Sequence, residues 1–156
     1  MGQETISVEK LVNTTPDKIF DILSRPSRHP EIDGSNSVIK VNSSAPEPLK
    51  LGDKFNMSMK LGLPYFMINT IVEYDENKKI AWQPKAPGIF GKFAGGRIWR
   101  YELEPSGDNN PIVKETWDIT QEANPLAKKM LLKGPAQKKV VQAIEKTLEN
   151  LANLFE

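Results

Sequence analysis

Glu115 is a carboxylate that the sequence places among large apolar side chains, where it could act as an acid or a base. Residues 97–104 and 112–120 alternate like strands, and their apolar-rich faces consist of Arg97, Trp99, Tyr101 and Leu103, and of Val113, Glu115, Trp117 and Ile119. If the turn between them is symmetric, Tyr101 lies opposite Glu115 and Trp99 opposite Trp117. A buried carboxyl facing a phenol has a raised pKa, which suits general acid/base catalysis. The alternative is a structural Glu115 paired with Tyr101 or Arg97 at the wet rim of a sheet.

His29 is the one histidine of the chain and the third candidate catalytic residue. Glu31 and Asp33 lie beside it, but three ligands so close on a short turn have poor geometry for a metal ion, so no metal site is expected. The alternative is a surface or capping histidine next to Pro30.

Methionine and aromatic side chains could line a binding cavity. The segment 54–61 places Phe55, Met57, Met59 and Leu61 on one face, and thioethers adapt to ligands of different shape. Trp82 could stack on a ligand in the same way. The alternative for these residues is ordinary core filling. For residues 65–74 the sequence leaves open whether the set beginning at Tyr65 or the set beginning at Phe66 faces inward.

Period-2 patterns predict an antiparallel sheet. A first strand is expected from Thr5 to Val12, and six more follow in a meander separated by turn residues. The six are approximately 38–42, 54–61, 65–74, 79–85, 97–104 and 112–120.

Helices are expected on either side of the meander. Thr15 and Pro16 predict a capped helix start, Pro26 ends that helix, and residues 27–37 form a short helical turn or loop. Asn124 and Pro125 open a C-terminal helix in which a kink is expected at Gly134-Pro135. A continuous apolar face then follows, made of Val140, Ile144, Leu148, Leu151 and Phe155. We therefore predict an α+β fold in which a curved sheet of about seven strands wraps around a long C-terminal helix.

Composition excludes several classes of protein. The 156 residues suit one domain, 1–156, and the 21 basic and 20 acidic residues nearly cancel, which argues against nucleic acid as a partner. The chain has no cysteine, and its first ten residues include charged side chains where a signal peptide needs an apolar stretch, so a cytoplasmic protein is expected. No apolar stretch is long enough for a transmembrane helix. Nucleotide, zinc and hydrolase motifs are absent, so we expect no cofactor.

The loop 87–96 combines four glycines with Ile89, Phe90 and Phe93. It could cover a cavity, make weak contact with a membrane surface, or simply connect two strands. The lysines of residues 128–139 could favour anionic lipid, although a solvated helix face is the commoner explanation.

The strings VEKLVNTTPDKIFDILSRPSRHPEIDG, LGDKF, KKIAWQP and RIWRYELEP, in this order of elements, resemble the START-like superfamily with the Bet v 1 helix-grip fold. The likeness is greatest to the bacterial polyketide cyclase/dehydrase-like branch. It implies a cavity between the sheet and the C-terminal helix for lipids, polyketides or other apolar molecules, with the segment of His29 at its mouth.

Three functions follow as hypotheses. The first is binding of a small hydrophobic molecule; the second is a cofactor-free polyketide cyclase (aromatase/cyclase) or dehydratase using Glu115, Tyr101 and His29; the third is a protein-interaction module with a filled cavity. The expected ligand contacts are Phe55, Met57, Met59, Trp82, Arg97, Trp99, Tyr101, Val113, Trp117, Ile144 and Leu148.

Overall fold

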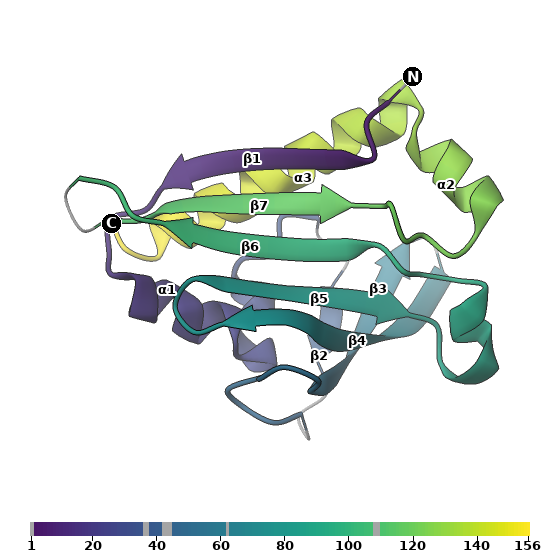
Figure 1. Cartoon of the computed structure of the whole chain (residues 1–156), viewed down its shortest axis with the longest axis horizontal. Helices are drawn as coiled ribbons and strands as arrows, with labels where there is room; N and C mark the ends of the chain where they lie inside the picture. The colour runs from purple at the N-terminus through teal and green to yellow at the C-terminus, as the bar shows by residue number, and fades with distance from the viewer. Residues whose placement is uncertain (1, 36–37, 42–44, 62, 108–109) are drawn as a thin grey trace.

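A curved antiparallel sheet and a long C-terminal helix form the framework of the protein (Figure 1). The structure is a computed structural model, and it describes residues 2–35, 38–41, 45–61, 63–107 and 110–156. The strands are β1 (Thr5–Leu11), β2 (Val38–Val41), β3 (Lys54–Leu61), β4 (Leu63–Asp75), β5 (Lys79–Lys85), β6 (Ile98–Glu104) and β7 (Ile112–Asp118). The helices are α1 (Pro16–Leu23), α2 (Pro125–Leu131) and α3 (Gly134–Asn153), and the short 3-10 helices are η1 (Pro26–Glu31) and η2 (Gly88–Lys92).

The seven strands lie in the order β1-β7-β6-β5-β4-β3-β2. The first strand therefore pairs with the last, and β1 and β2 form the two edges of the sheet. In Figure 1 the helix α3 passes behind β1 and β7, while β2 and β3 curl toward the same side as α3. We call the face that α3 covers the inner face and the opposite one the outer face. The predicted helix-grip α+β fold is confirmed, including the two short helices between the first and second strands.

Helix boundaries follow the predicted signals, with two corrections. The helix α1 begins at Pro16, but Thr15 makes no capping hydrogen bond because its hydroxyl interacts with the side chain of Asp17. Asn124 does cap α2, accepting hydrogen bonds from two backbone N–H groups at 3.0 and 3.1 Å. The expected kink at Gly134 is a complete break, since Lys133 has extended backbone angles and α3 starts anew.

Several strand ends differ from the prediction. β4 begins at Leu63, two residues early, and β6 begins at Ile98, one residue late. β7 ends at Asp118 instead of Thr120, because Asp118 Oδ1 accepts hydrogen bonds from the backbone N (2.9 Å) and hydroxyl (2.6 Å) of Thr120. Such a local turn competes with strand pairing. The predicted end of the second strand, Asn42, lies outside the described residues.

The open question about β4 is answered in its described part. Asn69 and Ile71 are buried, whereas Thr70 and Val72 are half-buried, so the set beginning at Tyr65 faces inward. The pairing with β5 shifts register after Ile71, and Glu73 therefore lies on the outer face. The bulge lets one strand supply apolar groups to the core and an acid to the outside.

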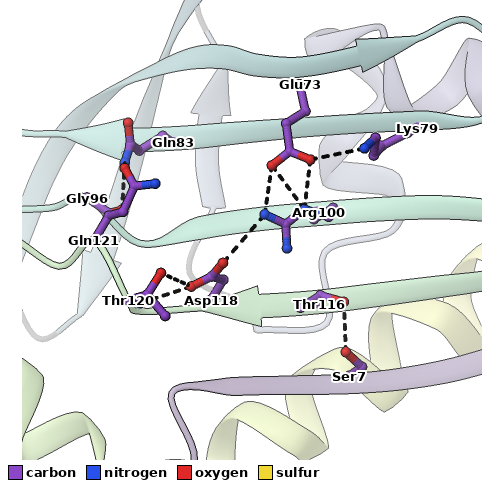
Figure 2. A network of polar contacts seen from close by, with 10 residues as sticks. All are labelled: Ser7, Glu73, Lys79, Gln83, Gly96, Arg100, Thr116, Asp118, Thr120 and Gln121. Carbon is purple, nitrogen blue, oxygen red and sulfur yellow. Dashed lines mark hydrogen bonds and ion pairs between the residues drawn. The ribbon is translucent and has the colours of Figure 1, made fainter.

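The outer face carries an ion-pair network that spans four strands (Figure 2). Arg100 on β6 donates to Glu73 on β4 at 2.7–3.0 Å, and its Nη2 lies 3.5 Å from Asp118 on β7. Lys79 Nζ lies 3.5 Å from Glu73. Beside this network, the hydroxyls of Ser7 and Thr116 are 2.8 Å apart, which links β1 to β7.

Candidate functional site

The inner face of the sheet brings Tyr101 and Glu115 together. The β6–β7 pairing puts Tyr101 opposite Glu115 and Trp99 opposite Trp117, which confirms the assumed register. The β5–β6 pairing adds Trp82 opposite Trp99. Directly paired residues on one face of a sheet lie in side-chain contact, so a row of three indoles runs beside the row that contains Tyr101 and Glu115.

His29 reaches this face from η1, and its position was the least accurately predicted of the three candidate catalytic residues. Its ring stacks on Trp82 with centroids 4.8 Å apart and an interplanar angle of 20°. Phe55 meets it edge-on at 5.4 Å. Only 5% of His29 is exposed, so the interpretation as a surface histidine is wrong. The interpretation as a capping histidine is supported, because its Nε2 contacts the carbonyl oxygen of Leu23, the last residue of α1. A stacking partner more than fifty residues away leaves no local signal in the sequence.

Hydrogen bonding fixes which nitrogen of His29 carries the proton. Nε2 lies 2.8 Å from the carbonyl oxygen of Leu23, which can only accept, so Nε2 is the donor. Burial lowers the pKa of His29 from 6.5 to about 4, so the ring is neutral at pH 7. Nδ1 is then an acceptor, and it has no hydrogen-bond partner among the described residues.

Glu115 is buried as deeply, with 2% of its surface exposed. Burial raises the pKa of its carboxyl from 4.5 to about 8; a hydrogen bond from Tyr101 opposes the shift, and the nearby charge of Asp33 adds to it. At pH 7 Glu115 is therefore mainly a neutral carboxylic acid. Its Oε1 has no hydrogen-bond partner in the described part of the chain. The alternative that placed Glu115 at a wet rim is wrong, although its predicted pairing with Tyr101 is present.

Aromatic contacts join these groups into one cluster, which we call the inner cluster: His29, Phe55, Trp82, Tyr101 and Glu115. The rings of Trp82 and Tyr101 lie 5.4 Å apart, and those of Phe55 and Trp82 6.0 Å apart. Burial and the adjacent Glu115 carboxyl raise the pKa of Tyr101, so its hydroxyl stays protonated. The inner cluster thus offers aromatic surface, one neutral acceptor and one neutral acid.

The remaining predicted ligand contacts are placed differently. Val113, Trp117, Ile144 and Leu148 are buried in the core that contains the inner cluster, and Trp99 packs against that core half-buried. The Nε of Arg97 lies 3.3 Å from a carboxylate oxygen of Glu122, whose side chain is 2% exposed. Arg97, which directly precedes β6, thus has its ion-pair partner outside the inner face and not at Glu115. The side chains of Met57 and Met59 lie outside the described residues.

The segment after η1 is fastened to α3 by contacts that the sequence did not reveal. The backbone N of Gly34 donates to Thr147 Oγ1 at 2.9 Å, and Asn150 Nδ2 donates to the carbonyl of Ile32 at 3.3 Å. A Cβ at Gly34 would lie 2.5 Å from backbone atoms of α3. Asp33, between these anchors, lies close enough to influence the pKa values of Glu115 and Tyr101. The prediction treated Gly34 only as a stop signal.

Comparison with known proteins agrees with this architecture. The profile of the family "Polyketide cyclase / dehydrase and lipid transport" matches residues 3–156. Among solved structures, ginseng major latex-like protein 151 from Panax ginseng superposes with a TM-score of 0.69 at 14% identity, covering 97% of this chain and 96% of that one. Protein CV1439 from Chromobacterium violaceum gives 0.64 at 13% identity, covering 98% and 97%. At these identities the likeness concerns the fold.

A curated relative is similar in sequence over most of the chain. The uncharacterized protein Rv0088 of Mycobacterium tuberculosis is 33% identical over 118 residues, which are 75% of this chain and 47% of that protein. The chain thus spans about half the length of the curated relatives that it matches. Within the described residues, no helix is long and apolar enough to cross a membrane. Because the family profile covers nearly its whole length, the chain belongs to the polyketide cyclase/dehydrase and lipid transport family, a START-like, Bet v 1-like group.

Proposed function

We propose that the protein binds a small, uncharged, largely aromatic molecule against the inner cluster, between the sheet and α3. The observation that carries this proposal is a pair of buried polar atoms, His29 Nδ1 and Glu115 Oε1, that have no hydrogen-bond partner among the described residues and lie in an aromatic surrounding. A buried acceptor without a donor costs roughly 1–3 kcal/mol. A ligand that donates a hydrogen bond there would recover that free energy.

The protonation states define the chemistry of the ligand. His29 is a neutral acceptor at pH 7, and Glu115, with a pKa of about 8, is a neutral acid. Neither supplies a charge to balance an ionic group, and burying an unpaired charge is far more costly than burying a hydroxyl. The ligand class that fits is therefore a planar apolar molecule with a hydroxyl, such as a phenol, rather than a carboxylate.

Three probes of nearly equal shape test this proposal: naphthalene, 2-naphthol and 2-naphthoate. Titrated at pH 7 and followed by tryptophan fluorescence and native mass spectrometry, 2-naphthol should bind 1:1 and about fivefold more tightly than naphthalene, the value of one net hydrogen bond. 2-Naphthoate should bind most weakly. The variant Arg100→Gln, altered on the outer face, should behave as the wild type.

Replacing His29 by Phe keeps a stacking ring but removes Nδ1. This variant should lose the preference for 2-naphthol over naphthalene while still binding both. If none of the three probes binds the wild type, or if 2-naphthoate binds best, the proposed ligand class is wrong. Absence of binding across a wider set of lipids and polyketides would favour the interaction module with a filled interior.

A second candidate function, catalysis of cyclisation or dehydration, is supported by the raised pKa of Glu115. A carboxyl that is protonated at pH 7 can donate a proton to a leaving hydroxyl or to a carbonyl oxygen, whereas above about pH 8 it becomes a base. With a poly-β-keto substrate, Glu115→Gln should lower turnover by about 100-fold or more if Glu115 is the acid. Unchanged turnover would remove Glu115 from the reaction and leave binding as the function.

A further inference from the structure

Large apolar side chains are exposed together at one end of the molecule. Ile89, Phe90 and Phe93 on η2 and the residue that follows it, with Leu126 and Met130 on α2, are 54–73% exposed. Leu126 and Met130 are four residues apart on a helix and therefore share a face. Both η2 and α2 lie at the right-hand end of the view in Figure 1. We call these five side chains the apolar end.

Backbone contacts fix the position of η2 relative to α2. The N–H of Ala123, just before α2, donates to the carbonyl of Gly95, just after η2, at 2.8 Å. Gly96 has a φ of +108°, and a Cβ there would lie 2.2 Å from the carbonyl oxygen of Gln121. Glycine is thus required where the loop after η2 meets the segment before α2. The two segments of the apolar end are consequently fixed relative to each other by the backbone.

The segments that form the apolar end also contain few acidic residues. Residues 83–97 and 123–144 contain no aspartate or glutamate, although the whole chain is nearly neutral. Lys92, Lys129 and Lys133 are exposed and form no ion pair among the described residues. At the opposite end, the β4–β5 turn carries the exposed acids Asp75 and Glu76 together with the exposed Lys78. The apolar end therefore carries lysines in excess of acids, whereas the opposite turn has a balanced charge.

We propose that the apolar end docks onto an anionic membrane surface. Aromatic side chains at the tip of a loop enter the boundary between headgroups and acyl chains, while nearby lysines are attracted to anionic headgroups. Charge complementarity favours this partner, because Lys92, Lys129 and Lys133 lie on or next to the same two helices as the apolar side chains, while Glu4, an acid at this end, is paired with Lys128. The proposal does not depend on what the inner cluster binds.

Vesicle sedimentation tests the proposal with the whole chain. At low salt the wild type should bind vesicles of phosphatidylcholine and phosphatidylglycerol, bind pure phosphatidylcholine weakly, and be released by salt, because screening weakens surface attraction. The variants F90S/F93S and K129E/K133E should each reduce partitioning into the anionic vesicles by at least about tenfold.

Matched controls separate the apolar end from general surface effects. Leu51→Ser removes a different exposed apolar side chain, and K10E/K18E reverses two exposed lysines elsewhere; both should bind as the wild type. In Phe90→Trp, the new indole should shift its emission to the blue on binding and be quenched by brominated lipid. The proposal is overturned if the wild type does not bind anionic vesicles at low salt, which would point to a protein partner. It is also overturned if F90S/F93S binds unchanged.

Discussion

The two faces of the sheet surround their carboxyl groups with opposite environments. On the outer face, Glu73 receives several charge-assisted hydrogen bonds from Arg100, and this guanidinium lowers the pKa of Glu73. On the inner face, Glu115 has a phenol as its hydrogen-bonding neighbour and no cationic partner in the described part of the chain, and burial raises its pKa to about 8. The outer carboxylate is ionised and paired, whereas the inner one is neutral and has an oxygen that no described residue hydrogen-bonds.

This difference separates groups that hold the sheet together from groups that are available to a ligand. Four residues of the outer face, which come from four strands, complete one another's hydrogen bonds and charges (Figure 2). A satisfied network stabilises the native state but has little to offer a ligand. On the inner face His29 and Glu115 each have one atom without a hydrogen bond to any described residue, and such unsatisfied groups are typical of functional regions.

The largest expected effect comes from breaking the inner face itself. Trp82→Ala removes the ring that contacts His29, Phe55 and Tyr101, and truncation of a buried aromatic side chain typically costs about 3–5 kcal/mol. Urea unfolding at pH 7 measures the loss. A cost below about 1 kcal/mol would mean that the indole is poorly packed and that the stacked geometry is wrong.

Glu115→Gln should remove a pH dependence of stability that the inner face creates. Because the folded-state pKa of Glu115 is raised to about 8, the folded protein holds a proton that the unfolded chain has released, and stability falls as pH rises toward 8. His29, with a pKa lowered to about 4, has the opposite slope between about pH 4 and 6.5.

The two slopes nearly cancel between about pH 4.5 and 6.5, so the effect of Glu115 is seen alone from pH 6.5 to 8. Over that window the free energy of unfolding of the wild type should fall by about 2 kcal/mol, and that of Glu115→Gln should stay nearly constant. Urea unfolding at a series of pH values measures both. An equal decline in the two proteins would show that Glu115 is not the titrating group.

Glu73→Gln makes the same chemical change on the outer face and should have the opposite consequence. The amide cannot pair with Arg100 as strongly, so the variant should lose about 1–2 kcal/mol at pH 7. Because the folded-state pKa of Glu73 is lowered, this contribution is present above its ordinary value of 4.5 and is lost as pH falls through the folded-state pKa. The difference from wild type should therefore shrink in acid. A variant as stable as the wild type at pH 7 would contradict the network.

The smallest expected effect concerns the hydroxyl pair between β1 and β7. Ser7→Ala in combination with Thr116→Val, analysed as a double-mutant cycle, should give a coupling energy of about 0.5–1 kcal/mol. Ser7 is exposed and Thr116 is buried on the outer face, so the loss of their contact should leave probe binding at the inner cluster unchanged. A change in probe affinity would show that the two faces are coupled through the sheet.

Most of the fold was predictable because its signals are local. Alternation located every strand to within a few residues, and Asn124-Pro125 marked the start of α2 correctly. The errors have local causes of a different kind: the turn formed by the Asp118 side chain, the extended backbone at Lys133 and the bulge in β4. Each depends on a conformation that residue type alone does not determine.

The site was predictable only where it lies on paired strands. Alternation and a symmetric turn sufficed to place Tyr101 beside Glu115. His29 and Gly34 come from an irregular segment whose position is set by contacts with Trp82 and with α3, far away in the chain. Periodicity carries no information about such contacts.

One measurement tests the central claim most directly, because the chain contains a single histidine. Nitrogen NMR of the labelled imidazole should show the neutral tautomer with hydrogen on Nε2, no protonation down to about pH 5, and a shift of the Nδ1 resonance on addition of 2-naphthol but not of naphthalene. A ring that titrates near pH 6.5, or an Nδ1 resonance that does not shift with 2-naphthol, would contradict the claim that His29 Nδ1 is a buried acceptor for a ligand hydroxyl.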